Sequence, residues 1–138
     1  MRKLPAFAAL LSLIAAPALA QDVEQKLAVE LNAQGSNEAG CLLTFMVTNS
    51  YAQEIESAVF ETVLFTKAGQ VDRLTLFDFG SLPAGRPRVR QFQVDGLQCE
   101  NLGQVLINGA STCKVSGVDS ALCNAPDLST RTGTEFLG

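Results

Sequence analysis

Residues 57–79, SAVFETVLFTKAGQVDRLTLFDF, decide the fold of this 138-residue chain. Two runs rich in Val, Leu, Thr and Phe, which favour β-strands, flank the turn-forming residues 67–70, KAGQ. The pattern predicts a long β-hairpin at the centre of an all-β domain.

Strict alternation along this hairpin puts apolar side chains on both faces of both strands. The opposing sheet of a sandwich covers only one face, so the second face needs another cover. The residues expected on that second face are Val63, Phe65, Thr75, Phe77 and Phe79. Either the C-terminal segment covers them, or they form an exposed patch of the kind that marks a partner interface.

Further strands are expected on both sides of the hairpin. Alternating or β-branched runs predict strands at residues 25–32, 41–49, 86–94 and 104–108. Residues 135–137 are expected either as a short edge strand or as a disordered end. Together these elements predict an antiparallel β-sandwich of about seven strands.

The N-terminus has the pattern of a cleaved secretory signal. Arg2 and Lys3 precede an apolar run over residues 4–14, which is too short to span a bilayer, and an Ala-Leu-Ala end at residues 18–20. This predicts a signal peptide at residues 1–20 and a single domain at residues 21–138; an uncleaved anchor is the alternative. The lipoprotein-like residues 39–41 follow Glu38 and no hydrophobic run, so we expect no stable membrane anchor.

The charge balance limits the classes of partner. Removal of residues 1–20 takes away Arg2 and Lys3 and no acid, which changes the net charge from −4 to −6. Nucleic acids and anionic membranes demand a basic field, so neither is expected as a partner. The expected location is the periplasm or the outside of the cell.

The four cysteines, Cys41, Cys99, Cys113 and Cys123, all follow the signal sequence. An even number of cysteines in an exported chain predicts two disulfides. If the strands alternate in direction, Cys41 and Cys99 fall at one end of the sandwich, and Cys113 falls near Cys123 at the other. We therefore expect those two pairings, with residues 110–138 forming a disulfide-closed, loop-rich segment. The chain has no His and no C-x-x-C pair, so no metal site is expected.

Arg86, Arg88 and Arg90 form a cluster with two interpretations. Arg side chains bind carboxylates and phosphates, which makes the cluster a candidate binding site. They also protect edge strands from self-pairing. If Phe92 points inward, alternation sends Arg90 inward too, and we expect either a bulge or a position at the sandwich rim with the guanidinium paired to an acid.

Parts of the pattern resemble the FxLYD-type bacterial immunoglobulin-like domains. The matching residues are 47–50 (VTNS), 62–66 (TVLFT) followed by Gly69, 82–85 (LPAG) and 92–94 (FQV). Thr62, Phe65 and Thr66 stand where that family has Phe, Tyr and Asp. The resemblance implies an immunoglobulin-like β-sandwich outside the cytoplasm and carries over no catalytic residue.

Catalysis is not expected from these residues. Without His the usual general base near neutral pH is absent. Paired carboxylates such as Glu61 and Asp78 would be needed for a hydrolase, and Glu61, in an apolar run, would need a partner such as Arg73 or Arg90.

We expect a non-catalytic protein without cofactors that serves as a protein-binding or accessory module of the envelope, through the hairpin face or the Arg cluster. The alternatives are a small-ligand carrier, which would need a pocket between the sheets, and the hydrolase.

Overall fold

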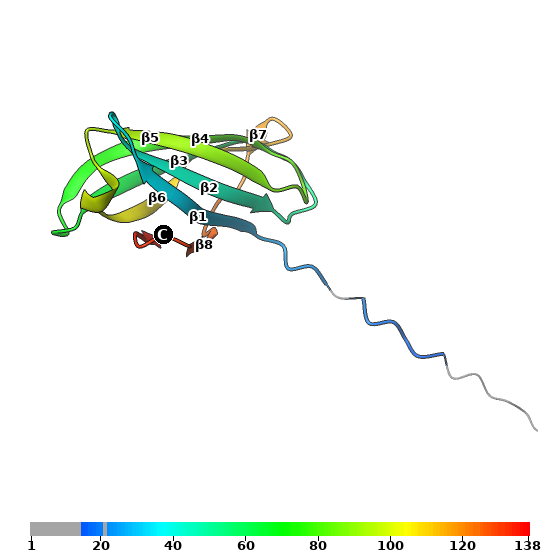
Figure 1. Cartoon of the computed structure of the whole chain (residues 1–138). Helices are drawn as coiled ribbons and strands as arrows, with labels where there is room; N and C mark the ends of the chain where they lie inside the picture. The colour runs from blue at the N-terminus through cyan, green and yellow to red at the C-terminus, as the bar shows by residue number, and fades with distance from the viewer. Residues whose placement is uncertain (1–14, 21) are drawn as a thin grey trace, which may run out of the picture.

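The structure is a computed structural model that describes residues 15–20 and 22–138. The described part contains nine strands and one short 3-10 helix (Figure 1). In chain order they are β1 Leu27–Ser36, β2 Gly40–Asn49, β3 Ile55–Thr66, β4 Val71–Leu82, β5 Arg88–Asp95, η1 Cys99–Asn101, β6 Leu102–Val115, β7 Val118–Asp119, β8 Asp127–Thr130 and β9 Glu135–Leu137. The predicted signal peptide lies mostly outside the described residues, and residues 15–20 carry no helix or strand.

The strands form two sheets that pack as a sandwich, as predicted. One sheet has the order β5-β2-β1-β8, and the other has the order β4-β3-β6-β7, with β9 also pairing β6. The predicted hairpin is confirmed as β3 and β4, joined by a turn in which Gly69 has a φ of +82°. That left-handed conformation favours glycine. We call the sheet that contains this hairpin the hairpin sheet.

The relative phase of the two hairpin strands differs from the prediction. Phe60 of β3 lies opposite Phe77 of β4, so even-numbered residues of β3 share a face with odd-numbered residues of β4. Phe77 and Phe79 therefore point into the core, where they are 3% and 0% exposed, and their placement on the outer face was wrong. The reason is an irregularity near the turn, where the register shifts between Leu64 and Phe65.

Phenylalanine rings fill the space between the sheets. Phe45 of β2 is fully buried and makes edge or tilted contacts with four other rings, at centroid distances of 5.3–5.9 Å. These rings belong to Phe77, Phe79, Phe92 and Phe136. Phe77 and Phe92 also stack at 4.2 Å, one from each sheet. The core thus draws on both sheets and on the C-terminal strand β9.

Both predicted disulfides are present. Cys41 at the start of β2 is bonded to Cys99 in η1, and Cys113 in β6 is bonded to Cys123 in the loop after β7. The two pairings expected from the alternation of strand direction are therefore confirmed. Two disulfides are typical of proteins in an oxidising compartment outside the cytoplasm.

The C-terminal part is more regular than a disulfide-closed loop. β6 continues past Gly109 to Val115, and two of the three irregularities in its pairing with β3 lie on either side of Gly109. β8 then pairs with β1 and β9 pairs with β6, both in parallel. Residues 127–137 cross from one sheet to the other, and of the two alternatives for residues 135–137 the edge strand is observed.

Two ion pairs join β1 and the segment before it to this crossing tail. Lys26 lies 2.9 Å from Asp127, and Arg131 lies 3.1 Å from Glu30. The hydrogen bond from Asn32 and then the one from Arg131 lower the pKa of Glu30 below its ordinary value of 4.5. The hydrogen bond and charge of Asp127 raise the pKa of Lys26 above its ordinary value of 10.5.

These shifts predict a pH window for tail attachment. The Glu30 contribution is fully present above pH 4.5 and is lost as pH falls through the lowered pKa, whereas the Lys26 contribution is fully present below pH 10.5 and is lost as pH rises through the raised pKa. Hydrogen exchange of residues 127–137, corrected for intrinsic rates, should therefore accelerate below pH 4.5 more than exchange of β3. Glu30→Gln should remove most of this acid dependence. The same acid dependence in the variant would contradict the assignment.

Candidate interaction surface

An apolar row crosses the outer face of the hairpin sheet. Leu74 of β4 lies opposite Val63 of β3, Val63 lies opposite Leu106 of β6, and Leu106 lies opposite Leu137 of β9. Strands are spaced about 4.8 Å apart, so this outer row spans roughly 14 Å. Leu74 is 60% exposed and Leu137 is 45% exposed at the two ends of the row, whereas Val63 is 7% exposed and Leu106 is half-buried between them.

Other side chains widen the row along the strands. Leu76, next to Leu74 on the same face, is 59% exposed, and the half-buried Phe65 lies opposite the exposed Val71. Val63 and Phe65 thus occupy the predicted outer face, while Leu74 and Leu76 replace Phe77 and Phe79 there. The sequence reasoning missed Leu106 and Leu137.

Carboxylates border this apolar surface. Glu61 lies opposite Leu76 and accepts a hydrogen bond from Asn108, and Asp78 accepts one from the backbone N–H of Gly80. Among residues 15–20 and 22–138, neither Glu61 nor Asp78 forms an ion pair. The predicted pairing of Glu61 with Arg73 or Arg90 is wrong, because Arg73 pairs with Asp72.

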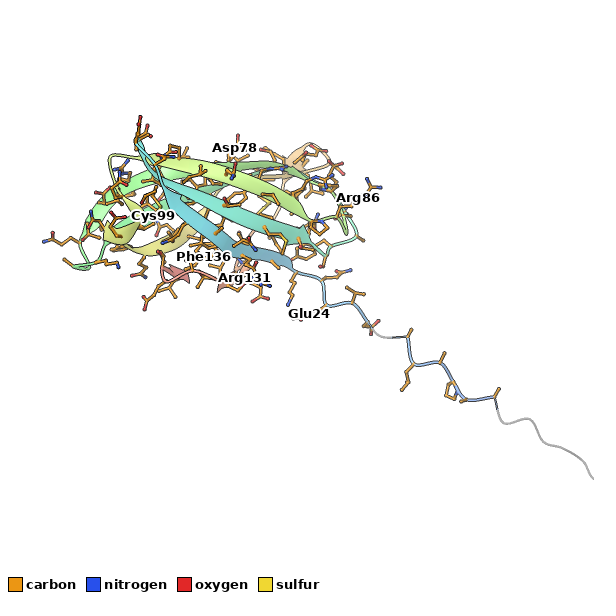
Figure 2. All side chains as sticks on the ribbon, viewed as in Figure 1. Glu24, Asp78, Arg86, Cys99, Arg131 and Phe136 are labelled. Carbon is orange, nitrogen blue, oxygen red and sulfur yellow. A yellow bond between two sulfur atoms is a disulfide. The ribbon has the colours of Figure 1, made fainter. Side chains whose placement is uncertain are left out.

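The C-terminal tail does not cover the outer row. β9 extends the hairpin sheet at the β6 edge and sends Phe136 into the core, and β8 belongs to the other sheet. Figure 2 shows the labelled Phe136 and Asp78 at opposite edges of the molecule, in line with the places of β9 and β4 at opposite edges of the hairpin sheet. The first of the two predicted alternatives, cover by the tail, is therefore wrong.

Arg90 has a structural partner that the sequence did not predict. β5 pairs with β2 without a bulge, so Arg90 lies at the sandwich rim. Its guanidinium donates to the carbonyl oxygens of Phe79 and Ser81, at 2.7 and 3.0 Å. The predicted acid partner was wrong, because these carbonyls on the edge strand β4 are in reach and accept the bonds instead.

The other two arginines of the cluster do not converge with Arg90 on a site. Arg88 donates to the carbonyl oxygen of Pro87 at 3.0 Å. Arg86 is exposed and projects away from the sandwich (Figure 2). Arg90 therefore bonds to the backbone of β4 at the rim, and Arg86 is exposed to solvent.

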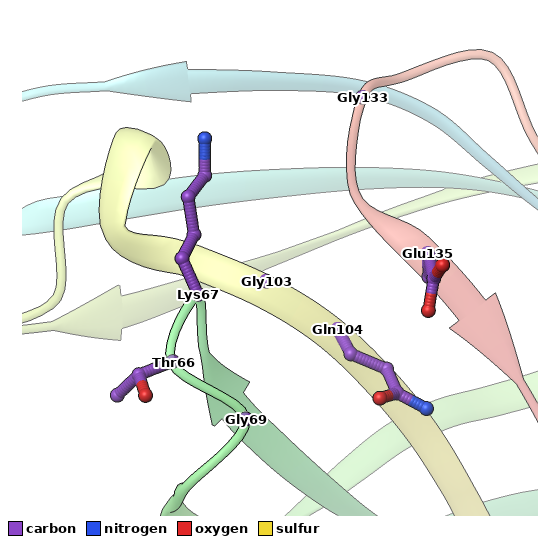
Figure 3. Close-up of a pocket in the computed structure, with 7 residues that line it drawn as sticks. All are labelled: Thr66, Lys67, Gly69, Gly103, Gln104, Gly133 and Glu135. Atoms are coloured by element: carbon purple, nitrogen blue, oxygen red, sulfur yellow. The ribbon is translucent and has the colours of Figure 1, made fainter.

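The surface hollows are weaker candidates for a binding site than the outer row. One of about 390 Å³ lies beside the β3–β4 turn, where the polar side chains of Lys67, Gln104 and Glu135 point in different directions (Figure 3). Another, of about 330 Å³, lies beside β6 around Gly109 and the last residue, Gly138. The space between the sheets is occupied by the phenylalanine core, which does not favour the carrier alternative.

The two carboxylates that the hydrolase alternative would need lie on the same face. Glu61 and Asp78 are diagonal neighbours on the outer face, and the adjacent hollow of about 160 Å³ is lined by Glu61, Leu74, Thr75 and Leu76. In the described part of the chain, no group of three or more His, Cys, Asp or Glu residues could hold a metal ion.

Comparison with known proteins gives no relative. A scan against protein-family models, a search of curated proteins and a search of solved structures each found no match. The resemblance to FxLYD-type domains therefore stays a prediction. Within residues 15–20 and 22–138, no helix is both long and apolar enough to cross a membrane.

Proposed function

We propose that this protein is a non-catalytic, exported module of the cell envelope, of immunoglobulin-like type, that binds another protein. The observation that carries the proposal is the outer row, an apolar line across four strands with carboxylates beside it. Interfaces combine an apolar centre with a polar rim, and this surface has both.

The energetics favour binding at this surface. Full burial of a Leu side chain contributes about 1.5–3 kcal/mol, and Leu74 and Leu76 keep more than half of their surface exposed. The inward phenylalanines of the core contribute to folding, whereas Leu74, Leu76 and Leu137 gain burial only from a partner. The two disulfides support a place for the protein in the periplasm or outside the cell.

A capture experiment with matched variants tests the proposal. The exported protein is immobilised and exposed to envelope extract, beside Leu74→Lys and Val89→Lys, because both positions are 60% exposed apolar residues on edge strands. We expect a partner that Leu74→Lys binds about tenfold more weakly or not at all, since the charge would have to be desolvated. Val89→Lys should bind normally. Capture that is equal for all three proteins, or absent for all three, would refute binding through the outer row.

A further inference from the structure

The free side of β4 is open along half of its length. β4 is the last strand of the hairpin sheet and, with 12 residues, is longer than the edge strands β5, β7, β8 and β9. An edge strand presents unpaired N–H and C=O groups that can accept a strand from another protein. The length of β4 makes it the edge with most room for such pairing.

Protection of this edge is confined to its second half. Arg90 donates hydrogen bonds to the carbonyl oxygens of Phe79 and Ser81, next to the register irregularity at Gly80. Between Val71 and Phe77, within the described part of the chain, neither a strand nor a side chain bonds to the free side of β4. No proline interrupts residues 71–77. The open half, residues 71–77, is therefore longer than the three-residue β9, and its register with β3 is regular from Arg73 to Phe77, beyond the bulge at Asp72.

The outer row ends at this same open half. Leu74 and Leu76 stand at the margin of the sheet, so a strand added to β4 would place its own outward side chains beside them. Asp78, at the end of the open half, has no cation partner among the described residues. A basic side chain opposite Asp78 would complete the charge pairing.

We propose that residues 71–77 of β4 accept an extended segment of a partner protein, with apolar side chains beside Leu74 and Leu76 and Lys or Arg beside Asp78. This inference rests on the proposed function and names the partner class. A second copy of the chain fits less well, because antiparallel pairing that sets Leu74 against Leu76 of the other copy also brings Asp72 toward its Asp78. Both copies also carry a net negative charge.

Peptide probes test the inference without changing the fold. The exported protein is titrated with a short peptide that alternates Leu and Lys, with the same peptide N-methylated along its backbone, and with a matched Leu/Glu peptide. Amide shifts and hydrogen exchange are followed by NMR. We expect the Leu/Lys peptide to bind and to protect amides within residues 71–77. The other two peptides should bind at least about tenfold more weakly, because one loses the backbone hydrogen bonds and the other brings like charge to Asp78.

Matched variants separate this inference from the proposed function. Leu74→Lys should weaken Leu/Lys binding about tenfold, and Val89→Lys should leave it unchanged. Equal binding of the N-methylated peptide, or shifts on Leu106 and Leu137 without protection of residues 71–77, would overturn strand addition and leave binding through the outer row intact. No binding of the Leu/Lys peptide would also overturn the inference. Dimerisation in sedimentation with residues 71–77 protected in the absence of peptide would replace the partner with a second copy.

Discussion

We expect the double variant Cys41→Ala/Cys99→Ala to lose about 4 kcal/mol of unfolding free energy, because its disulfide spans 58 positions of sequence. In the chain-entropy account, a crosslink over a long loop restricts the unfolded chain most. Cys41 is also fully buried, so its loss removes packing as well. Urea denaturation under non-reducing conditions measures the effect, and the slope should rise because the unfolded chain exposes more surface.

The second disulfide supplies the matched control for this prediction. It spans 10 positions, so Cys113→Ala/Cys123→Ala should lose about 3 kcal/mol, less than the first variant. The order of the two losses is the critical result. A larger loss for the short loop would mean that the disulfides act mainly through local packing of the C-terminal part.

Phe45→Ala should destabilise the fold by about 3–5 kcal/mol, the range for a large aromatic side chain removed from a core. Phe45 is completely buried and contacts rings from β4, β5 and β9. Its removal therefore weakens the packing between the two sheets and the packing of β9 against the core. Denaturant unfolding measures the loss. Hydrogen exchange should show faster exchange in β9 than in wild type.

A surface substitution of similar chemistry gives the comparison. Leu76→Ala removes an apolar side chain that is 59% exposed, and we expect a change within about 0.5 kcal/mol. If Phe45→Ala cost no more than Leu76→Ala, the rings between the sheets would not be the main source of stability.

The hairpin was predictable from local signals, and the disulfide pairings were predictable from the alternation of strand direction. The Val, Leu, Thr and Phe runs around Gly69 favour strands joined by a turn, and antiparallel alternation is enough to bring Cys41 near Cys99. The relative phase of β3 and β4 was not predictable, since both faces of β4 are apolar and hydrophobicity alone cannot choose between Leu76 and Phe77. A register shift near the turn made that choice.

The outer row could be predicted only in part for a different reason. Val63 was assigned correctly by alternation, but Leu106 and Leu137 lie in strands that pair in parallel across 31 residues of sequence. Short strands such as β9 have little propensity of their own, and the burial of Phe136 decides where this one pairs. The partner of Arg90 likewise depended on where the edge of β4 came to lie.

The crossing tail also sets the order in which the chain can fold. β8 pairs with β1 across 99 residues, and β9 supplies Phe136 to the ring cluster around Phe45. Contacts between such distant residues form slowly, because a long loop must close before they contribute. One sheet is complete only when β8 has left the ribosome and the hairpin sheet only when β9 has, so a chain still being synthesised lacks the last strand of both sheets. Such an incomplete chain is closer to the unfolded state that passage through a membrane channel requires.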